Sequence, residues 1–119
     1  MRYLLMIYSN EAPPASPEAG QALMNEYWAF NTEVDRRGIN KASEALQPTA
    51  TATTVRMHNG KTSITDGPFA ETKEQLGGFF LIDVKNLDEA IEIAKLCPGV
   101  KHGSIELRPI MELGEPAPQ

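Results

Sequence analysis

The stretch that decides the fold is Asp66-Gly67-Pro68-Phe69-Ala70-Glu71-Thr72-Lys73-Glu74-Gln75-Leu76-Gly77-Gly78-Phe79-Phe80-Leu81-Ile82-Asp83-Val84. It begins with a stiff turn, because proline fixes its own φ and keeps the preceding residue out of the α region. A polar run follows that contains the ionisable side chains of Glu71, Lys73 and Glu74. The last six residues, 79–84, are mostly apolar and predict a buried strand. A charged loop held between a rigid turn and a buried strand is a reasonable place for a binding site.

The residues around this stretch predict further elements on its C-terminal side. Thr72-Lys73-Glu74-Gln75 has the spacing of a capping box and predicts a turn of helix that Gly77-Gly78 ends. Asn86, with Glu89 three residues later, predicts a capped helix that Pro98-Gly99 stops. The stripe expected to be buried in this helix is Leu87, Ala90, Ile91 and Ala94. Residues 103–110 read as the last strand, and the tail 114–119, which holds two prolines, is expected to be frayed.

The N-terminal side predicts a hairpin, a long helix and a first strand. Residues 51–58 and 61–65 are the expected arms of a hairpin around Asn59-Gly60, the favoured dipeptide of a type I′ turn. Ser16-Pro17 predicts the start of a helix that runs to about residue 37, with Gly38 as a left-handed cap. Residues 3–8 are apolar throughout and predict a strand buried on both faces, whereas 42–46 could form either a short edge strand or an irregular passage. The apolar stripe expected on the long helix is Leu23, Tyr27, Phe30 and Val34, flanked by Met24 and Trp28.

The element order β-α-β-β-β-α-β predicts one α+β domain over residues 1–119, with a ferredoxin-like, split βαβ antiparallel sheet and two helices on one face. Two helices can cover only one face of a sheet whose strands 3–8 and 79–84 are apolar on both. A second copy of the same sheet is the economical cover for the other face, which predicts a homodimer. The alternative is that an N-terminal or hairpin segment folds over that face.

Composition limits the partners and cofactors that we expect. The chain has 119 residues, a net charge of -5 and one cysteine. An acidic chain argues against nucleic acid and against an anionic membrane surface. No apolar run approaches a spanning helix and no signal-peptide pattern is seen, so the expected location is cytoplasmic. Two histidines and one cysteine do not have metal-ligand spacing, and no phosphate-binding glycine loop is present, so we expect neither a metal nor another cofactor.

Several of these motifs together resemble the DGPF-domain branch of the YCII-related family. The resemblance lies in Asp66-Gly67-Pro68-Phe69, Glu71, Lys73-Glu74 and Gly78-Phe79, in residues 102–109 and in residues 1–7. It implies a ferredoxin-like fold that pairs into a dimeric α/β-barrel. It implies little about chemistry, although some relatives in the wider group are associated with lyase-type steps on chlorinated ring-cleavage products. Proteins of the DGPF branch are often encoded beside sigma factors of the extracytoplasmic-function type.

Two candidate sites follow from the expected sheet, in which the first strand runs antiparallel to the last strand and parallel to strand 79–84. The first is the charged loop, where Asp66, Glu71 and Lys73 are expected to lie near Arg108 and to bind substrate. Glu74 and Arg2 belong to the same expected group. A carboxylate beside arginine stays ionised, so this arrangement suits binding or ordering of the loop better than acid catalysis.

The second candidate site, at the opposite end of the sheet, is His102 with Tyr8 and Ser9. Histidine exchanges a proton near neutral pH and tyrosine can orient a carbonyl, so His102 and Tyr8 are the candidate catalytic residues. The competing interpretation is that His102 only caps or solvates a strand end. His58 is expected to be a solvated hairpin residue, and Tyr27 and Trp28 are expected to be core residues.

Two function hypotheses remain open at this point. One is a small dimeric enzyme, a lyase or isomerase acting on a small organic acid with His102 transferring the proton. The other is a non-catalytic binding or regulatory module linked to sigma-factor-dependent transcription. A polar pocket near His102 would favour the enzyme, and a filled apolar interior would favour the module.

Overall fold

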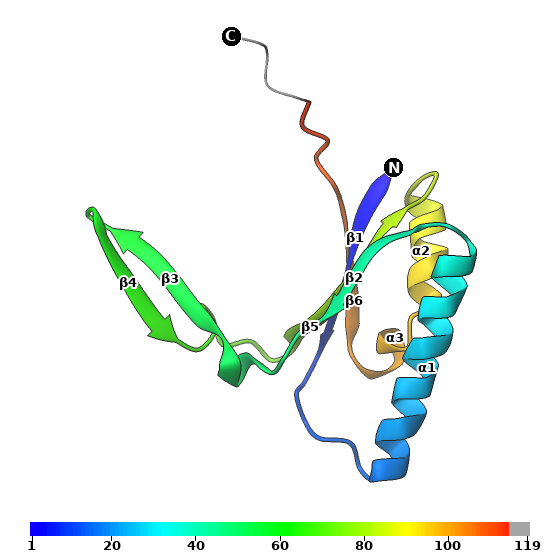
Figure 1. Ribbon diagram of the computed structural model, residues 1–119, viewed down its shortest axis with the longest axis horizontal. Coiled ribbons are helices and arrows are strands. Elements are labelled where there is room, and N and C mark those ends of the chain that lie inside the picture. Colours follow the sequence, from blue (N-terminus) through cyan, green and yellow to red (C-terminus); the bar gives the residue numbers. More distant parts are fainter. Residues whose placement is uncertain (115–119) are drawn as a thin grey trace.

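The computed structural model describes residues 1–114 and shows an α+β fold with three helices, a four-stranded sheet and a separate hairpin (Figure 1). The predicted frayed tail lies outside the described residues except for Gly114. Among the described helices, none is long and apolar enough to span a bilayer. In chain order the elements are β1 (Arg2–Ser9), α1 (Pro17–Arg36), β2 (Asn40–Ala45), the 3-10 turn η1 (Thr49–Thr51), β3 (Thr53–His58), β4 (Lys61–Asp66), β5 (Gln75–Asp83), α2 (Leu87–Leu96), α3 (Gly99–His102) and β6 (Ser104–Pro109).

The main sheet has the strand order β2-β5-β1-β6, and all of its neighbouring strands are antiparallel. This confirms the ferredoxin-like sheet. Of the two alternatives for residues 42–46, the structure shows the edge strand, as β2 (Asn40–Ala45). The expected parallel pairing of the first strand with residues 79–84 is wrong, because Arg2 pairs with Asp83 and Ser9 pairs with Gln75. A split βαβ unit places an antiparallel strand between its two parallel strands, and β5 is that strand here. The antiparallel pairing places the start of β5 beside the end of β1.

The core lies between the sheet and the helices, which cover one face of the sheet (Figure 1). Leu5 and Ile82 of the central strands are fully buried, as are Val34 of α1 and Ile93 of α2. Cross-strand partners share a face, so the register assigns every other residue of β1 to this core and the alternate ones to the open face. The side chains on the open face of the central strands are Leu4, Met6, Phe79 and Leu81. No described helix lies over them, although Met6 is buried by its neighbours on this face and the other three are half-buried.

The caps of the two longer helices form where the sequence predicts them. The Ser16 hydroxyl accepts a hydrogen bond from the Ala19 N–H at 3.1 Å, and the Asn86 side chain accepts one from the Glu89 N–H at 3.0 Å. Gly38 takes a left-handed φ of 71° after α1. The predicted buried stripe of α2 is wrong in part: Ala90 and Ala94 are buried with Ile93. Leu87 and Ile91 are exposed instead, because the face of α2 that packs on the core is centred on Ile93.

The predicted helical turn at residues 72–75 does not form. The Thr72 hydroxyl donates to the Glu74 carbonyl at 2.6 Å, and Gln75 already starts β5. Gly77-Gly78 therefore lies inside the strand rather than at a helix end. A Cβ on Gly78 would come within 3.0 Å of the Glu44 carbonyl oxygen, so glycine permits the close approach of β2.

The β3–β4 hairpin has the predicted turn, with φ of 50° at Asn59 and 77° at Gly60. It pairs only with itself and projects away from the sheet, on the side opposite the helices (Figure 1). We call residues 53–66 the arm. It does not fold over the open face of its own sheet, so the alternative cover considered from the sequence is not seen.

The junction between α3 and β6 gives a stability prediction. A Cβ on Gly103 would lie 1.9 Å from the Tyr8 carbonyl oxygen, so Gly103→Ala must displace backbone. We expect it to reduce the free energy of unfolding by about 1–3 kcal/mol, as overpacking does, measured by urea denaturation. Gly114→Ala is the control, because its Cβ would meet nothing within 4 Å. Equal stability of the two variants would contradict this packing.

Candidate functional site

A cleft of about 720 Å³ lies between α1 and the sheet. It exists because only the C-terminal half of α1 packs tightly: Phe30 and Val34 are buried, whereas Met24 and Trp28 are 53% and 63% exposed. The volume is in the range of small-molecule sites, and the walls are largely apolar. The residues that line it are Ile7, Ser9, Pro14, Gly20, Leu23, Met24, Tyr27, Trp28, Asn31, Ser43, Glu44, Ala45, Gly77, Gly78, Phe80, Gly99 and His102.

Tyr27 contributes a neutral hydroxyl to this cleft. Burial, and then the neighbouring Cys97 thiol, raise the pKa of Tyr27 to about 12, although the Gly99 backbone acts in the opposite direction. A Cβ on Gly99 would lie 2.8 Å from the Tyr27 hydroxyl oxygen, so glycine leaves the room that the phenol occupies. The phenol therefore stays protonated at neutral pH and can donate a hydrogen bond to a bound oxygen atom.

His102 is the last residue of α3 and lines the same cleft. The chain forms this short helix directly after α2 and Pro98, and the helix packs against β1 and β6. His102 is exposed as well as part of the cleft lining, so its imidazole is open both to solvent and to a ligand.

Tyr8 lies close to His102 along the backbone, but its side chain points to the other face of the sheet. It pairs with Ser104, which confirms the expected neighbourhood of the two strand ends. The Tyr8 hydroxyl donates to the Glu106 carboxylate at 3.2 Å, on the open face. Burial, and then this carboxylate, raise the pKa of Tyr8. The structure thus does not bring the two candidate catalytic side chains into one cleft.

The charged loop lies at the same end of the sheet as His102, not at the opposite end as expected. Glu74 accepts a hydrogen bond from the Ser104 hydroxyl at 2.7 Å, which ties the loop to the start of β6. Arg108 instead pairs with Glu106 at 3.0 Å, and Arg2 pairs with Glu112 at 2.8 Å. The antiparallel register is the reason, because it places both arginines toward the far end of the sheet.

Asp66, Glu71 and Lys73 are exposed, and the structure does not gather them around Arg108. Asp66 ends β4 opposite Thr53. Gly67 has a φ of 104°, which favours glycine, and its N–H donates to the Ala52 carbonyl at 2.7 Å. These contacts fit the interpretation in which the Asp66-Gly67-Pro68 turn orders the loop.

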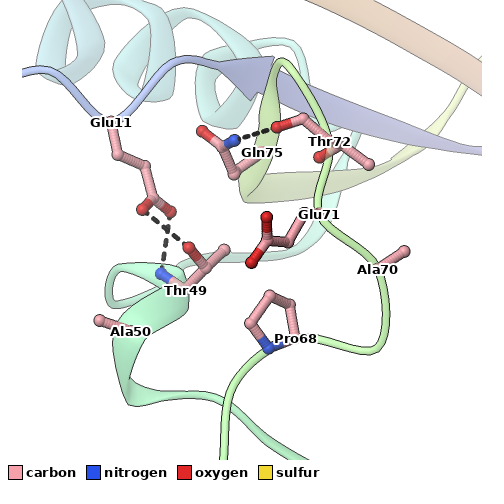
Figure 2. Close-up of a pocket in the computed structure, with 8 residues that line it drawn as sticks. All are labelled: Glu11, Thr49, Ala50, Pro68, Ala70, Glu71, Thr72 and Gln75. Carbon is pink, nitrogen blue, oxygen red and sulfur yellow. Dashed lines mark hydrogen bonds between the residues drawn. The ribbon is translucent and has the colours of Figure 1, made fainter.

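A second, smaller pocket of about 350 Å³ lies at the base of the arm (Figure 2). The Glu11 carboxylate accepts hydrogen bonds from the backbone N–H and the hydroxyl of Thr49, both at 2.9 Å. Glu71 extends toward Thr49 and Pro68 from the opposite side (Figure 2). Within residues 1–114, no group of three or more histidine, cysteine or acidic side chains is placed to hold a metal ion. We interpret this pocket as the joint that fixes the arm.

The sequence did not identify Tyr27 and Trp28 as cleft residues. Their helical spacing is that of a buried stripe, and no local signal shows that the N-terminal half of α1 stands away from the sheet. Two glycines leave room for neighbouring groups: Gly99 for the Tyr27 hydroxyl and Gly103 for the Tyr8 carbonyl. Both follow Pro98 closely in the sequence, and this was the one available sign that another group approaches the backbone there.

The family model described as YCII-related domain matches residues 1–114. An uncharacterized protein, R00369, from Rhizobium meliloti (strain 1021) is 38% identical over 114 residues, with 92% of each chain covered. Among solved structures, 5-chloro-2-hydroxyhydroquinone dehydrochlorinase from Burkholderia phenoliruptrix AC1100, in complex with 2,5-dihydroxybenzoquinone, has a TM-score of 0.50. It is 13% identical, covering 93% of this chain and 94% of that one, so this likeness shows the fold alone.

The raised pKa of Tyr27 predicts a pH dependence of stability. Because the folded-state pKa is about 12 and the unfolded value is 10.0, folding favours the protonated phenol. Its contribution is complete below pH 10 and is lost as the pH rises toward 12. The stability of Tyr27→Phe should therefore fall less steeply over this range than that of the natural chain, measured by urea denaturation at several pH values. Parallel curves for Tyr27→Phe and the natural chain would contradict the prediction.

Proposed function

The chain belongs to the YCII-related family, and from that premise we propose that it is a small enzyme that binds an organic acid in the α1–sheet cleft. We further propose that His102 transfers a proton there, in a lyase- or isomerase-type step. The observation that carries the proposal is the cleft itself, which joins one titratable imidazole and one neutral phenol within apolar walls. An open cleft is what an enzyme needs, whereas a regulatory module that acts through its surface needs none.

The cleft favours a substrate with a flat apolar body and a polar end. Leu23, Trp28 and Phe80 offer an apolar surface for the body. His102 and Tyr27 offer a proton acceptor and a hydrogen-bond donor for the polar end. The similar solved structure holds 2,5-dihydroxybenzoquinone, a ring compound of this general kind, which supports a small acidic ring or ring-derived acid as the substrate class.

The proposed chemistry uses the two groups in different roles. Neutral His102 would accept the proton from a carbon next to a carbonyl group, and the C–H electron pair would move toward the carbonyl oxygen. The Tyr27 hydroxyl would donate a hydrogen bond to that oxygen as its negative charge develops. Imidazolium would then return the proton to a different carbon in an isomerisation, or assist a leaving group in an elimination.

The proposal includes a homodimer built through the open face of the sheet. Leu4, Phe79 and Leu81 are half-buried on this face, beside the buried Met6, and no described helix covers them. A second copy would remove this apolar surface from water. Tyr8, Glu106 and Arg108 share the same face, so they would meet the partner rather than a small substrate.

The dimer can be tested with a charge on the open face. Leu81→Glu should convert the dimer to a monomer, because the carboxylate would be buried without a partner. Sedimentation velocity measures the change. Gln21→Glu, on an exposed part of α1, is the control that adds the same charge and should leave the dimer intact. A natural chain that sediments as a monomer at micromolar concentration would refute the dimer.

The enzymatic role can be tested with the single tryptophan as a ligand sensor. Trp28 is the only tryptophan and lines the cleft, so its fluorescence should change when an acid from a panel of small aromatic and ring-derived compounds binds. For a compound that both binds and is converted, His102→Gln should reduce turnover by about 10²–10⁴-fold, the range of general acid–base catalysis, while binding persists. His58→Gln, in the arm, is the matched control. Unchanged turnover in His102→Gln would refute the role of His102.

A further inference from the structure

We propose that the arm of one copy packs its apolar face over the mouth of the α1–sheet cleft in a second copy, so that each cleft is completed by the partner chain. The inference rests on the proposed function, because the arm of the partner would complete the lining of the same substrate cleft. It identifies the partner of the arm as this chain itself rather than as another protein.

The arm is an amphipathic ribbon with an unpartnered apolar face. Val55 and Ile64 are direct cross-strand partners, and Met57 lies on the same face. These three side chains are 63%, 71% and 73% exposed. An isolated two-stranded hairpin is marginally stable in water, so a ribbon with this face needs a surface to pack against.

The arm cannot reach the cleft of its own chain. The sheet stands between them, because the arm projects from the open side and α1 covers the other side (Figure 1). The base of the arm is also held in place. Glu11 binds Thr49 through two hydrogen bonds, and the Thr54 hydroxyl donates to the Gly67 carbonyl at 2.8 Å. The arm is therefore fixed in an orientation that suits a contact with another molecule.

The mouth of the cleft offers a complementary surface. Met24 and Trp28 are largely exposed there and provide apolar area of the same kind as the arm. The basic side chains of the arm, Arg56 and Lys61, lie on its other face, so the contact proposed here is an apolar one.

A second copy is the occupant that the geometry favours. The arm and the open face lie on the same side of the sheet, so a copy that covers the open face enters the space between sheet and arm (Figure 1). The helices of the second copy then lie on the far side of its own sheet, where they face the arm of the first copy. A two-fold axis repeats the contact, so two arms embrace two copies and both apolar surfaces are covered.

The first test measures how accessible Trp28 is to acrylamide. Ile64→Asp places a charge on the apolar face of the arm, so we expect stronger quenching and a red-shifted emission. Ser63→Asp adds the same charge on the opposite face of the same strand and should change neither. Circular dichroism melting checks that the core is intact in both variants. Quenching that is the same in Ile64→Asp and in the natural chain would overturn the proposal.

The second test is a cross-link between two differently substituted chains. A mixture of Met57→Cys and Met24→Cys proteins should form an interchain disulfide under mild oxidation, seen as a dimer on a non-reducing gel. The natural Cys97 is buried and does not compete. Arg56→Cys, on the other face of the arm, replaces Met57→Cys in the control mixture and should give far less product. Equal yields from the two mixtures would overturn the proposal.

Neither readout uses a substrate, so the outcome is separate from that of the proposed function. If neither test detects the arm contact, the proposal for the arm fails, and the role of His102 is still tested separately by turnover. A chain without turnover could still show the cross-link.

Discussion

The structure depends on a central strand that is apolar on both of its faces. β1 lies between β5 and β6, and its residues alternate between the helix-covered core and the open face. Leu5 is fully buried under the helices, while its neighbours Leu4 and Met6 face the other way. Burial of apolar area is the main favourable term in folding, so a strand of this kind requires cover on two sides. The chain supplies helices for one side only.

The cleft results from how the cover on the helix side is distributed. Phe30 and Val34 are buried and pack the C-terminal half of α1 against the sheet. The rings of Phe30 and Phe80 are in edge-to-face contact, with their centroids 5.0 Å apart. The N-terminal half continues past this contact and leaves Leu23 and Trp28 over open space. The helix is thus anchored at one end and forms the wall of a site at the other. The absence of a side chain at Gly99 leaves room for the Tyr27 hydroxyl, and His102 lines the same cleft from α3.

The charged loop joins the two parts of the molecule. It follows the arm and precedes β5, so the contacts that order it also orient the arm. The Gly67 backbone bonds to the start of the arm, and Glu74 bonds to Ser104 at the start of β6. The loop therefore sets the position of the arm relative to the sheet, which is a structural role with a consequence for the proposed dimer. An arm that completes the partner's cleft would couple assembly to the site.

Sequence patterns alone are enough to predict the local elements and the packing of helices on one face of a sheet. Ser16 and Asn86 cap helices, Asn59-Gly60 makes the hairpin turn, and the apolar strands identify the sheet, because capping, turn chemistry and periodicity act over a few residues. Only the tertiary structure decided where the candidate site lies. Because β1 and β5 are antiparallel, the charged loop lies at the same end of the sheet as His102. The side chain of Tyr8 lies on the open face of the sheet, whereas His102 lines the cleft on the helix side. Tyr27 lines the cleft because α1 packs on a strand that is distant in the sequence, through the contact of Phe30 with Phe80. Register and helix placement arise from the sum of many distant contacts, and no short stretch of sequence encodes such a sum.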